Sequence, residues 1–499
     1  MYGPRYVVGA SVWSLKYVIE NGSHSREDYE LRKALGQNPD KPSPVGFNED
    51  EVTLDMTKIT ATAAFPAGIF AAYHAYPYYP DFLNNEAKYL KAVGSFGPSN
   101  YYGYLQDLKA YHGDQPIVIA EYGVPSSRAN AHQNPFGLHH GSHSEESQAR
   151  IDTQLSGEIE QSGMAGGIVF ALMDEWFKKN WLVYRLERPA ERRPMWHSMM
   201  DAEQNYGLIA AEPAAALRLR GLPSSVWKSK PALSGNSNSS TSNSSTSKMT
   251  VKSFADPEYL HLLIETPLAA KDSLELAIDT HPDGGVALPW IGSNRAEFRI
   301  RLEPTKGYLN IVSGYAPFIN SDLNGFEFGA WDARAHPPLI EGNAATLEVA
   351  WTKWLTQTNR ERIGRDSTIY PRKTWDEGVL RQGLDPVGGR NPMLDYTWTP
   401  NGVQLRLPWV LLMFTDPSSR RVFDGKVRNE ANKDANYTRP VKDIGLNARS
   451  LNGTSTKTSS PALRYTWPTW EEPKYAMRNK PAYYAFQRAW ATNFVEARK

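Results

Sequence analysis

Three apolar runs in the first half of the chain end in side chains that can carry out nucleophilic or acid–base chemistry. The runs start at residues 67, 115 and 165. Their ends carry the candidate site residues, which are His74, Tyr76, Glu121, Tyr122, Asp174 and Trp176. A carboxylate can attack or stabilise an oxocarbenium-like centre, a tyrosine hydroxyl can hold that carboxylate, and an indole can stack on a sugar ring. These residue types fit a saccharide site, although polar residues at strand ends are also typical of solvated loops.

The pattern between the runs predicts the elements that would bring these residues together. Each run is short and almost continuously apolar, which is typical of parallel strands covered on both faces. Helical spacing of apolar residues separates the runs, with Ser142 as the expected start of the second helix and Gly163 as its end. Alternating strands and helices predict βαβ units, as in a (β/α)8 barrel or a doubly wound sheet. In a barrel, the candidate residues would converge at the carboxyl ends of the strands.

The three runs resemble consecutive strands of the clan A retaining glycoside hydrolases. His74-Ala75-Tyr76 resembles the H-x-Y that ends the sixth strand, "IVIAEYG" the seventh strand with its terminal nucleophilic glutamate, and "GGIVFALMDEWF" the eighth. The stretch from Glu121 to Arg150 is also similar to clan A barrels that are joined to a carbohydrate-binding-like sandwich. The resemblance spans about residues 52–213.

This resemblance implies a role for each candidate residue. Glu121 would be the nucleophile, Tyr76 its hydrogen-bond partner, and His74 and Trp176 would contact substrate. Tyr122 and Asp174, at the same strand ends, are further candidate substrate contacts.

The proton donor that such an enzyme needs is not evident. In that clan it is a Glu that follows an Asn at the end of the fourth strand. Only 66 residues precede Ala67, whereas a full barrel takes about 250 residues. Tyr6–Trp13 is a candidate fifth strand, and Asn48-Glu49 follows no apolar run. The sequence therefore predicts an incomplete barrel with little or no hydrolase activity, whose missing half is supplied by another chain or is absent from this fragment.

Composition excludes several classes of function. The net charge of +1 argues against binding to nucleic acid or acidic lipid. The absence of cysteine excludes disulfides and thiolate metal sites. No apolar run of about 18 residues predicts a membrane span, and no signal peptide is recognisable. Location stays unknown, with an extracellular or cell-surface site expected for a parent protein.

Metal and cofactor sites are not predicted. "HHGSH" places His139, His140 and His143 close together, but this is not the helical H-x-x-x-H spacing, and a loop over the barrel mouth explains it better. No Gly-rich phosphate loop or G-x-S-x-G elbow follows a strand. Structural calcium at the acidic loop Asp279–Asp283 stays open without support.

The second half predicts an antiparallel β-sandwich. A Ser/Asn/Thr-rich stretch, Ser234–Lys248, is typical of a flexible linker. The predicted domains are an incomplete barrel at 1–215, a linker at 216–248 and a sandwich at 249–499 with a closing helix. Short strand-like segments with turns between them resemble the family 9 carbohydrate-binding modules. Trp409 there is either a sugar platform or a core tryptophan.

Two function classes follow from these observations. One is a retaining glycoside hydrolase acting on an oligo- or polysaccharide through Glu121. The alternative is a non-catalytic carbohydrate-binding or cell-surface protein.

Overall fold

The computed structural model describes residues 57–233, 249–315, 351–423 and 438–496. Within these ranges there are short gaps at 58, 61, 65–67, 181, 184–185, 188, 215–216, 222–224, 270, 283, 293, 313–314, 360–361, 364–367 and 372. The Ser-rich stretch 234–248, the Asn48-Glu49 pair and the candidate strand Tyr6–Trp13 lie outside the described residues.

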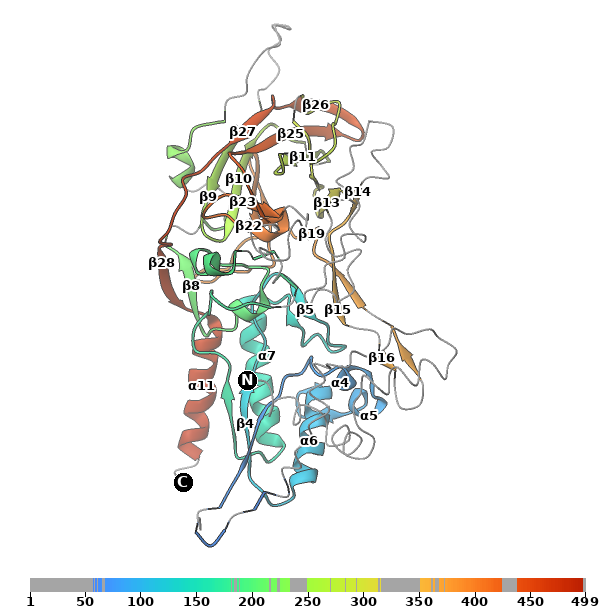
Figure 1. The fold of residues 1–499 in the computed structure, drawn as a ribbon, viewed down its shortest axis with the longest axis vertical. Helices are drawn as coiled ribbons and strands as arrows, with labels where there is room; N and C mark the ends of the chain where they lie inside the picture. Colours follow the sequence, from blue (N-terminus) through green and yellow to red (C-terminus); the bar gives the residue numbers. More distant parts are fainter. Residues whose placement is uncertain are drawn as a thin grey trace, which may run out of the picture.

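The first part of the chain contains a three-stranded parallel sheet in the order β1-β4-β7 (Figure 1). The strands are β1 (Ala71–His74), β4 (Ile117–Tyr122) and β7 (Gly166–Val169). Two short helices, α4 (Phe82–Asn85) and α5 (Ala87–Leu90), precede the long helix α6 (Asn100–His112), and α7 (Glu145–Gln161) connects β4 to β7. Helix α7 begins later than predicted, because the side chain that caps it is Ser144 and not Ser142.

Helices α6 and α7 cover one face of this sheet. The core between them is formed by Tyr104, Leu105, Leu108, Ile151, Leu155 and Ile159 from the helices and by Ala71, Tyr73, Ile117, Ile119 and Tyr122 from the strands. The opposite face is open at several large apolar side chains, since Phe70, Ile168 and Leu172 are 61%, 59% and 63% exposed. The side chains that alternate along each strand therefore divide into a helix-covered set and an open set.

The second part consists of antiparallel sheets around a shared core. One sheet has the order β20-β21-β10-β9, with β20 (Tyr396–Thr399), β21 (Gly402–Pro408), β10 (Tyr259–Glu265) and β9 (Thr250–Ala255). The larger sheet has the order β14-β13-β12-β11-β25-β26, with β14 (Trp351–Lys353), β13 (Gly307–Val312), β12 (Phe298–Leu302), β11 (Ser273–Asp279), β25 (Ile444–Asn452) and β26 (Ser455–Ser459). Leu262 and Leu405 of the first sheet share a core with Leu276 and Ile300 of the second, as expected for a sandwich.

The chain leaves the sandwich and returns to the first part. Strand β28 (Tyr475–Asn479) pairs with β8 (Ile209–Pro213), and α11 (Pro481–Glu496) packs against α7. Figure 1 shows this return as the red strand and helix beside the cyan elements of the first part. Ala482 and Phe486 of α11 belong to the core of the α/β part. The predicted closing helix is present, and it lies against the first part of the chain.

Part of the segment assigned to the linker is packed. Leu217 and Trp227 are 3% and 1% exposed and form a small cluster with Leu263 of β10. The chain is thus ordered on both sides of the Ser-rich stretch.

The expected combination of an α/β part with antiparallel β-sheets is confirmed at that level. Strands β1, β4 and β7 form an open sheet of three parallel strands, and an isolated parallel bridge joins Met173 to Ile209 of β8. Closure of these strands into a barrel is not seen among the described residues. None of the helices in the described ranges is both long and apolar enough to cross a membrane.

Candidate functional site

Glu121 is held by two of the residues that the sequence analysis selected. The Tyr76 hydroxyl donates a hydrogen bond to Glu121 Oε2 over 2.9 Å, and His74 Nδ1 lies 3.0 Å from the same oxygen. The side chains of His74 and Glu121 are 37% and 26% exposed. A partly exposed carboxylate is therefore fixed at the carboxyl end of a parallel sheet, where α/β proteins place their ligands.

The fold explains why these three side chains meet. Residue His74 ends β1 and pairs in register with Glu121 near the end of β4. Tyr73 and Tyr122 point into the helix-covered core, so His74 and Glu121 project from the open face. Tyr76 follows two residues after β1 and is 5% exposed, which leaves its hydroxyl directed at the carboxylate.

Tyr122 lies on the other side of the sheet from Glu121. It is 1% exposed, and burial raises the pKa of its hydroxyl to about 12, although a hydrogen bond with Ser156 of α7 acts in the opposite direction. Gly167 of β7 is required beneath it, because a Cβ there would lie 2.9 Å from the Tyr122 ring. The structure does not bring Tyr122 together with Glu121.

Asp174 and Trp176 lie at the junction with the C-terminal strand. Asp174 is 2% exposed, accepts a hydrogen bond from Gly207 N and forms an ion pair with Lys480 Nζ over 2.7 Å. The Trp176 ring packs on Tyr475 of β28 with a centroid distance of 5.5 Å. Both side chains are thus engaged in holding β28 against the α/β part.

An aromatic cluster that the sequence analysis missed adjoins Glu121. The ring centroid of Tyr206 lies 6.1 Å from Tyr76 and 5.0 Å from Phe170. Phe170 follows β7 directly, and its amide donates to Tyr122 O over 2.9 Å. Because Val169 pairs with Tyr122, the next residue, Phe170, projects toward the open face on which Glu121 lies.

Two carboxylates and a lysine lie next to this cluster. Lys178 Nζ is 4.1 Å from the centroid of the Phe170 ring, 3.0 Å from Glu175 Oε2 and 4.0 Å from Glu203 Oε2. His140 Nε2 lies 3.4 Å from Glu203 Oε1, and the His140 ring stacks on Tyr78 at 4.5 Å. In the sequence, the alternation of side chains along β7 is the pattern that predicts Phe170 on the same face of the sheet as Glu121.

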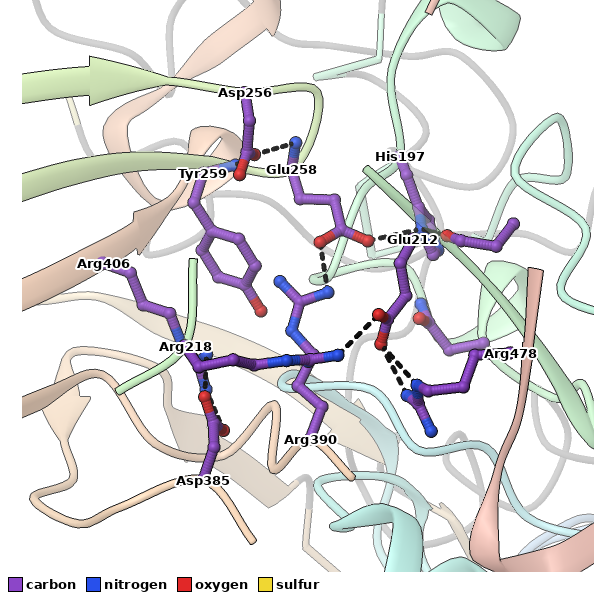
Figure 2. Close-up of polar contacts among 12 residues, drawn as sticks. His197, Glu212, Arg218, Asp256, Glu258, Tyr259, Asp385, Arg390, Arg406 and Arg478 are labelled. Atoms are coloured by element: carbon purple, nitrogen blue, oxygen red, sulfur yellow. Dashed lines mark hydrogen bonds and ion pairs between the residues drawn. The ribbon is translucent and has the colours of Figure 1, made fainter. Parts of the chain in front are cut away.

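A second polar assembly fills the junction between the α/β part and the sandwich (Figure 2). Glu212 of β8 accepts from Arg478 of β28 and from Arg218, while Glu258 of the sandwich is paired with both His197 and Arg390. Burial alone would raise the pKa of Glu212, but the charge of Arg390 and the hydrogen bonds from Arg478 and Arg218 lower this pKa to about 2. These charges neutralise one another across the junction.

The space inside this assembly is too small for a sugar. Asp174, His197, Glu212, Glu258, Arg390 and Lys480 line a cavity of about 10 Å³. Such a volume holds about one water molecule. The junction is therefore a connection between the two parts.

The histidines of "HHGSH" have structural partners. His139 Nδ1 accepts a hydrogen bond from Asn134 N, and His143 Nε2 contacts His139 O over 3.0 Å. Burial lowers the pKa of His139 to about 4 and that of His143 to about 3. Across the described part of the chain, no three His, Cys, Asp or Glu side chains gather as they would around a metal ion. Asp279 pairs with Arg464, and residue 283 lies outside the described residues.

Trp409 is a core residue of the sandwich. It is 0% exposed and packs against Trp467 in a tilted arrangement at 4.9 Å and against Phe414 edge-to-face at 5.1 Å. Its Nε1–H donates to Asp256 O over 2.8 Å. Of the two alternatives open for Trp409, this position excludes a sugar platform in the folded protein.

Buried carboxyl groups make stability depend on pH. Burial raises the pKa of Glu297 to about 8 and those of Asp201 and Glu377 to about 7. Between pH 6.5 and 8 the folded state holds protons that the unfolded state has lost, so stability falls as pH rises, by about 1.4 kcal/mol per pH unit for each fully protonated group. The lowered pKa values of His139 and His143 affect the free energy of unfolding only below pH 6.5.

We expect urea unfolding to show a lower midpoint at pH 8 than at pH 6.5, and Glu297→Gln to reduce that difference by removing one of these groups. Glu472→Gln, at an exposed position, should leave the difference unchanged. Equal pH dependence in the wild type and Glu297→Gln would contradict this assignment.

Comparisons of the chain with protein-family models, with curated proteins and with solved structures give no match.

Proposed function

We propose that this chain is a carbohydrate-active protein in which Glu121 acts as the nucleophile of a retaining glycoside hydrolase, on strands that belong to an incomplete (β/α)8 barrel. The observation that carries the proposal is the double contact of Tyr76 and His74 with one oxygen of Glu121, at the exposed carboxyl end of a parallel sheet. A nucleophilic carboxylate needs this kind of fixed orientation, because catalysis depends on alignment with the reacting carbon.

In the proposed reaction Glu121 Oε1 attacks the anomeric carbon while Tyr76 and His74 hold Oε2. The glycosidic bond breaks, its electron pair leaves on the departing oxygen, and a glycosyl ester of Glu121 forms. Water then attacks the same carbon, releases Glu121 as a carboxylate and gives its proton to the group that had protonated the departing oxygen. Phe170, on the same face of the neighbouring strand, supplies an aromatic surface for the sugar ring in place of Trp176.

The departing oxygen also needs a proton donor, and we place that donor on a partner chain that completes the barrel. The open sheet face supports this placement, since Phe70, Ile168 and Leu172 there are each more than half exposed. Without the partner, hydrolysis of natural saccharides is expected to be slow, because loss of general acid catalysis costs a factor of about 10²–10⁴.

A covalent trap tests Glu121 without the proton donor. Dinitrophenyl 2-deoxy-2-fluoroglycosides carry a leaving group that departs as a stable anion, and the fluorine slows the hydrolysis step. We expect a panel of such reagents to include at least one that adds its fluoroglycosyl mass to the peptide containing Glu121. Glu121→Gln should abolish the label, and Glu472→Gln should keep it.

Two results without a label on Glu121 would contradict the proposal. Saccharide binding without any label on Glu121 would overturn the hydrolase proposal in favour of the non-catalytic carbohydrate-binding alternative. Absence of both label and binding would overturn carbohydrate function at this site altogether.

A further inference from the structure

We propose that Lys178, Glu175 and Glu203 form a recognition cluster that binds the hydroxyl groups of a neutral sugar and rejects acidic sugars. This inference rests on the function proposed for Glu121 and adds the class of substrate. None of the three residues was among those selected from the sequence for this site.

Aromatic side chains connect the cluster to the reacting carboxylate. Phe170 and Glu121 project from the same face of adjacent parallel strands, and neighbouring strands are about 4.8 Å apart. Lys178 Nζ lies 4.1 Å from the centroid of the Phe170 ring. The ring of Tyr206, in turn, links Phe170 to Tyr76, which donates to Glu121. The rings of Phe170, Tyr206 and Tyr76 therefore connect the cluster to Glu121, and the proposed sugar would extend along them.

The three side chains offer both kinds of hydrogen-bonding partner. The side chains of Lys178, Glu175 and Glu203 are 30%, 26% and 22% exposed, although Glu175 Oε2, the oxygen next to Lys178, is buried. An ammonium group donates hydrogen bonds and carboxylates accept them, whereas each sugar hydroxyl can do both. Alternating acceptors and a donor therefore suit a row of neutral hydroxyl groups.

The charges of the cluster determine which sugars it accepts. Lys178 is already shared between two carboxylates, at 3.0 Å from Glu175 and 4.0 Å from Glu203. A uronic acid would add another carboxylate beside these two and Glu121, and like charges at such separations repel. A neutral sugar adds no charge.

The arrangement differs from an ordinary surface ion pair. An exposed Glu–Lys pair three residues apart usually contributes little to stability. Here the lysine also contacts a carboxylate from a separate segment, Glu203 of the short helix η4 (Ala202–Gln204), and lies over an aromatic ring. Two segments of the chain thus meet at one ammonium group over Phe170.

The test uses paired dinitrophenyl 2-deoxy-2-fluoroglycosides of glucose and glucuronic acid configuration, or another neutral and acidic pair in whichever sugar series labels Glu121. We expect the wild type to label at least tenfold faster with the neutral reagent. Lys178→Met keeps the aliphatic stem over Phe170 and should slow neutral labelling about tenfold. Glu203→Gln should narrow the neutral-to-acidic ratio at least threefold. Lys228→Met, at an exposed lysine remote in sequence, is the matched control and should change neither.

The possible failures are distinguishable. If no reagent labels Glu121, the proposed function fails. If Glu121 is labelled and the neutral-to-acidic ratio is the same in the wild type, Lys178→Met and Glu203→Gln, this inference alone is overturned. Circular dichroism of each variant checks folding, and a loss of structure alone would lower both rates without changing their ratio.

Discussion

Arg128→Met is expected to lower the free energy of unfolding at pH 7 by about 3–5 kcal/mol, because removing the guanidinium leaves the buried Asp395 carboxylate unpaired. Arg128 is 0% exposed and lies after β4, and its contacts cross into the sandwich. Its Nε lies 2.7 Å from Asp395 Oδ1, Nη1 lies 3.3 Å from Glu377 Oε2, and Nη2 donates to Val379 O. Urea unfolding followed by circular dichroism measures the change.

Two further variants separate this ion pair from a general loss of charge. Arg150→Met removes an exposed arginine and should cost less than about 0.5 kcal/mol. Combining Arg128→Met with Asp395→Asn and Glu377→Gln removes the whole set of charges and should recover part of the loss. Equal effects of Arg128→Met and Arg150→Met would refute the structural role assigned to Arg128.

Trp409→Ala is also expected to cost about 3–5 kcal/mol, since truncating a large buried aromatic residue leaves a cavity in the core. The indole packs against Trp467 and Phe414 and donates to Asp256 O, so both packing and a buried hydrogen bond are lost. The unfolding midpoint of the full chain, read from tryptophan fluorescence and circular dichroism, checks this.

The matched comparison for Trp409 is Trp490→Ala on α11, whose side chain is 38% exposed and packs on Phe486. It should cost clearly less than Trp409→Ala. If Trp409→Ala instead left stability unchanged while abolishing saccharide binding, the buried position of this indole would be wrong.

Local sequence patterns predicted the residues around Glu121 because those residues sit on adjacent strands. Parallel apolar runs with polar ends place His74 and Glu121 at one sheet edge, and Tyr76 follows closely. Because side chains alternate along a strand, Tyr122, the residue after Glu121, faces the opposite side of the sheet. The sequence analysis nevertheless placed both residues at one site. The same rule applied to β7 would have selected Phe170.

Long-range partners were not predictable in this way. Asp174 pairs with Lys480, 306 residues later in the chain, and Trp176 packs on Tyr475. Nothing near Asp174 in the sequence distinguishes a residue that faces a ligand from one that pairs with a distant strand. Arg128 is similar, because its carboxylate partners come from the sandwich.

The position of α11 has a consequence for biosynthesis. Helix α7 emerges from the ribosome early, but Phe486, which packs into the same core, is translated only after the entire sandwich. The α/β part must therefore wait with apolar surface uncovered while more than two hundred residues are added, the circumstance in which nascent chains depend on chaperones. The α/β part is therefore complete only when α11 packs against α7, and this packing is expected to be the slowest step in folding.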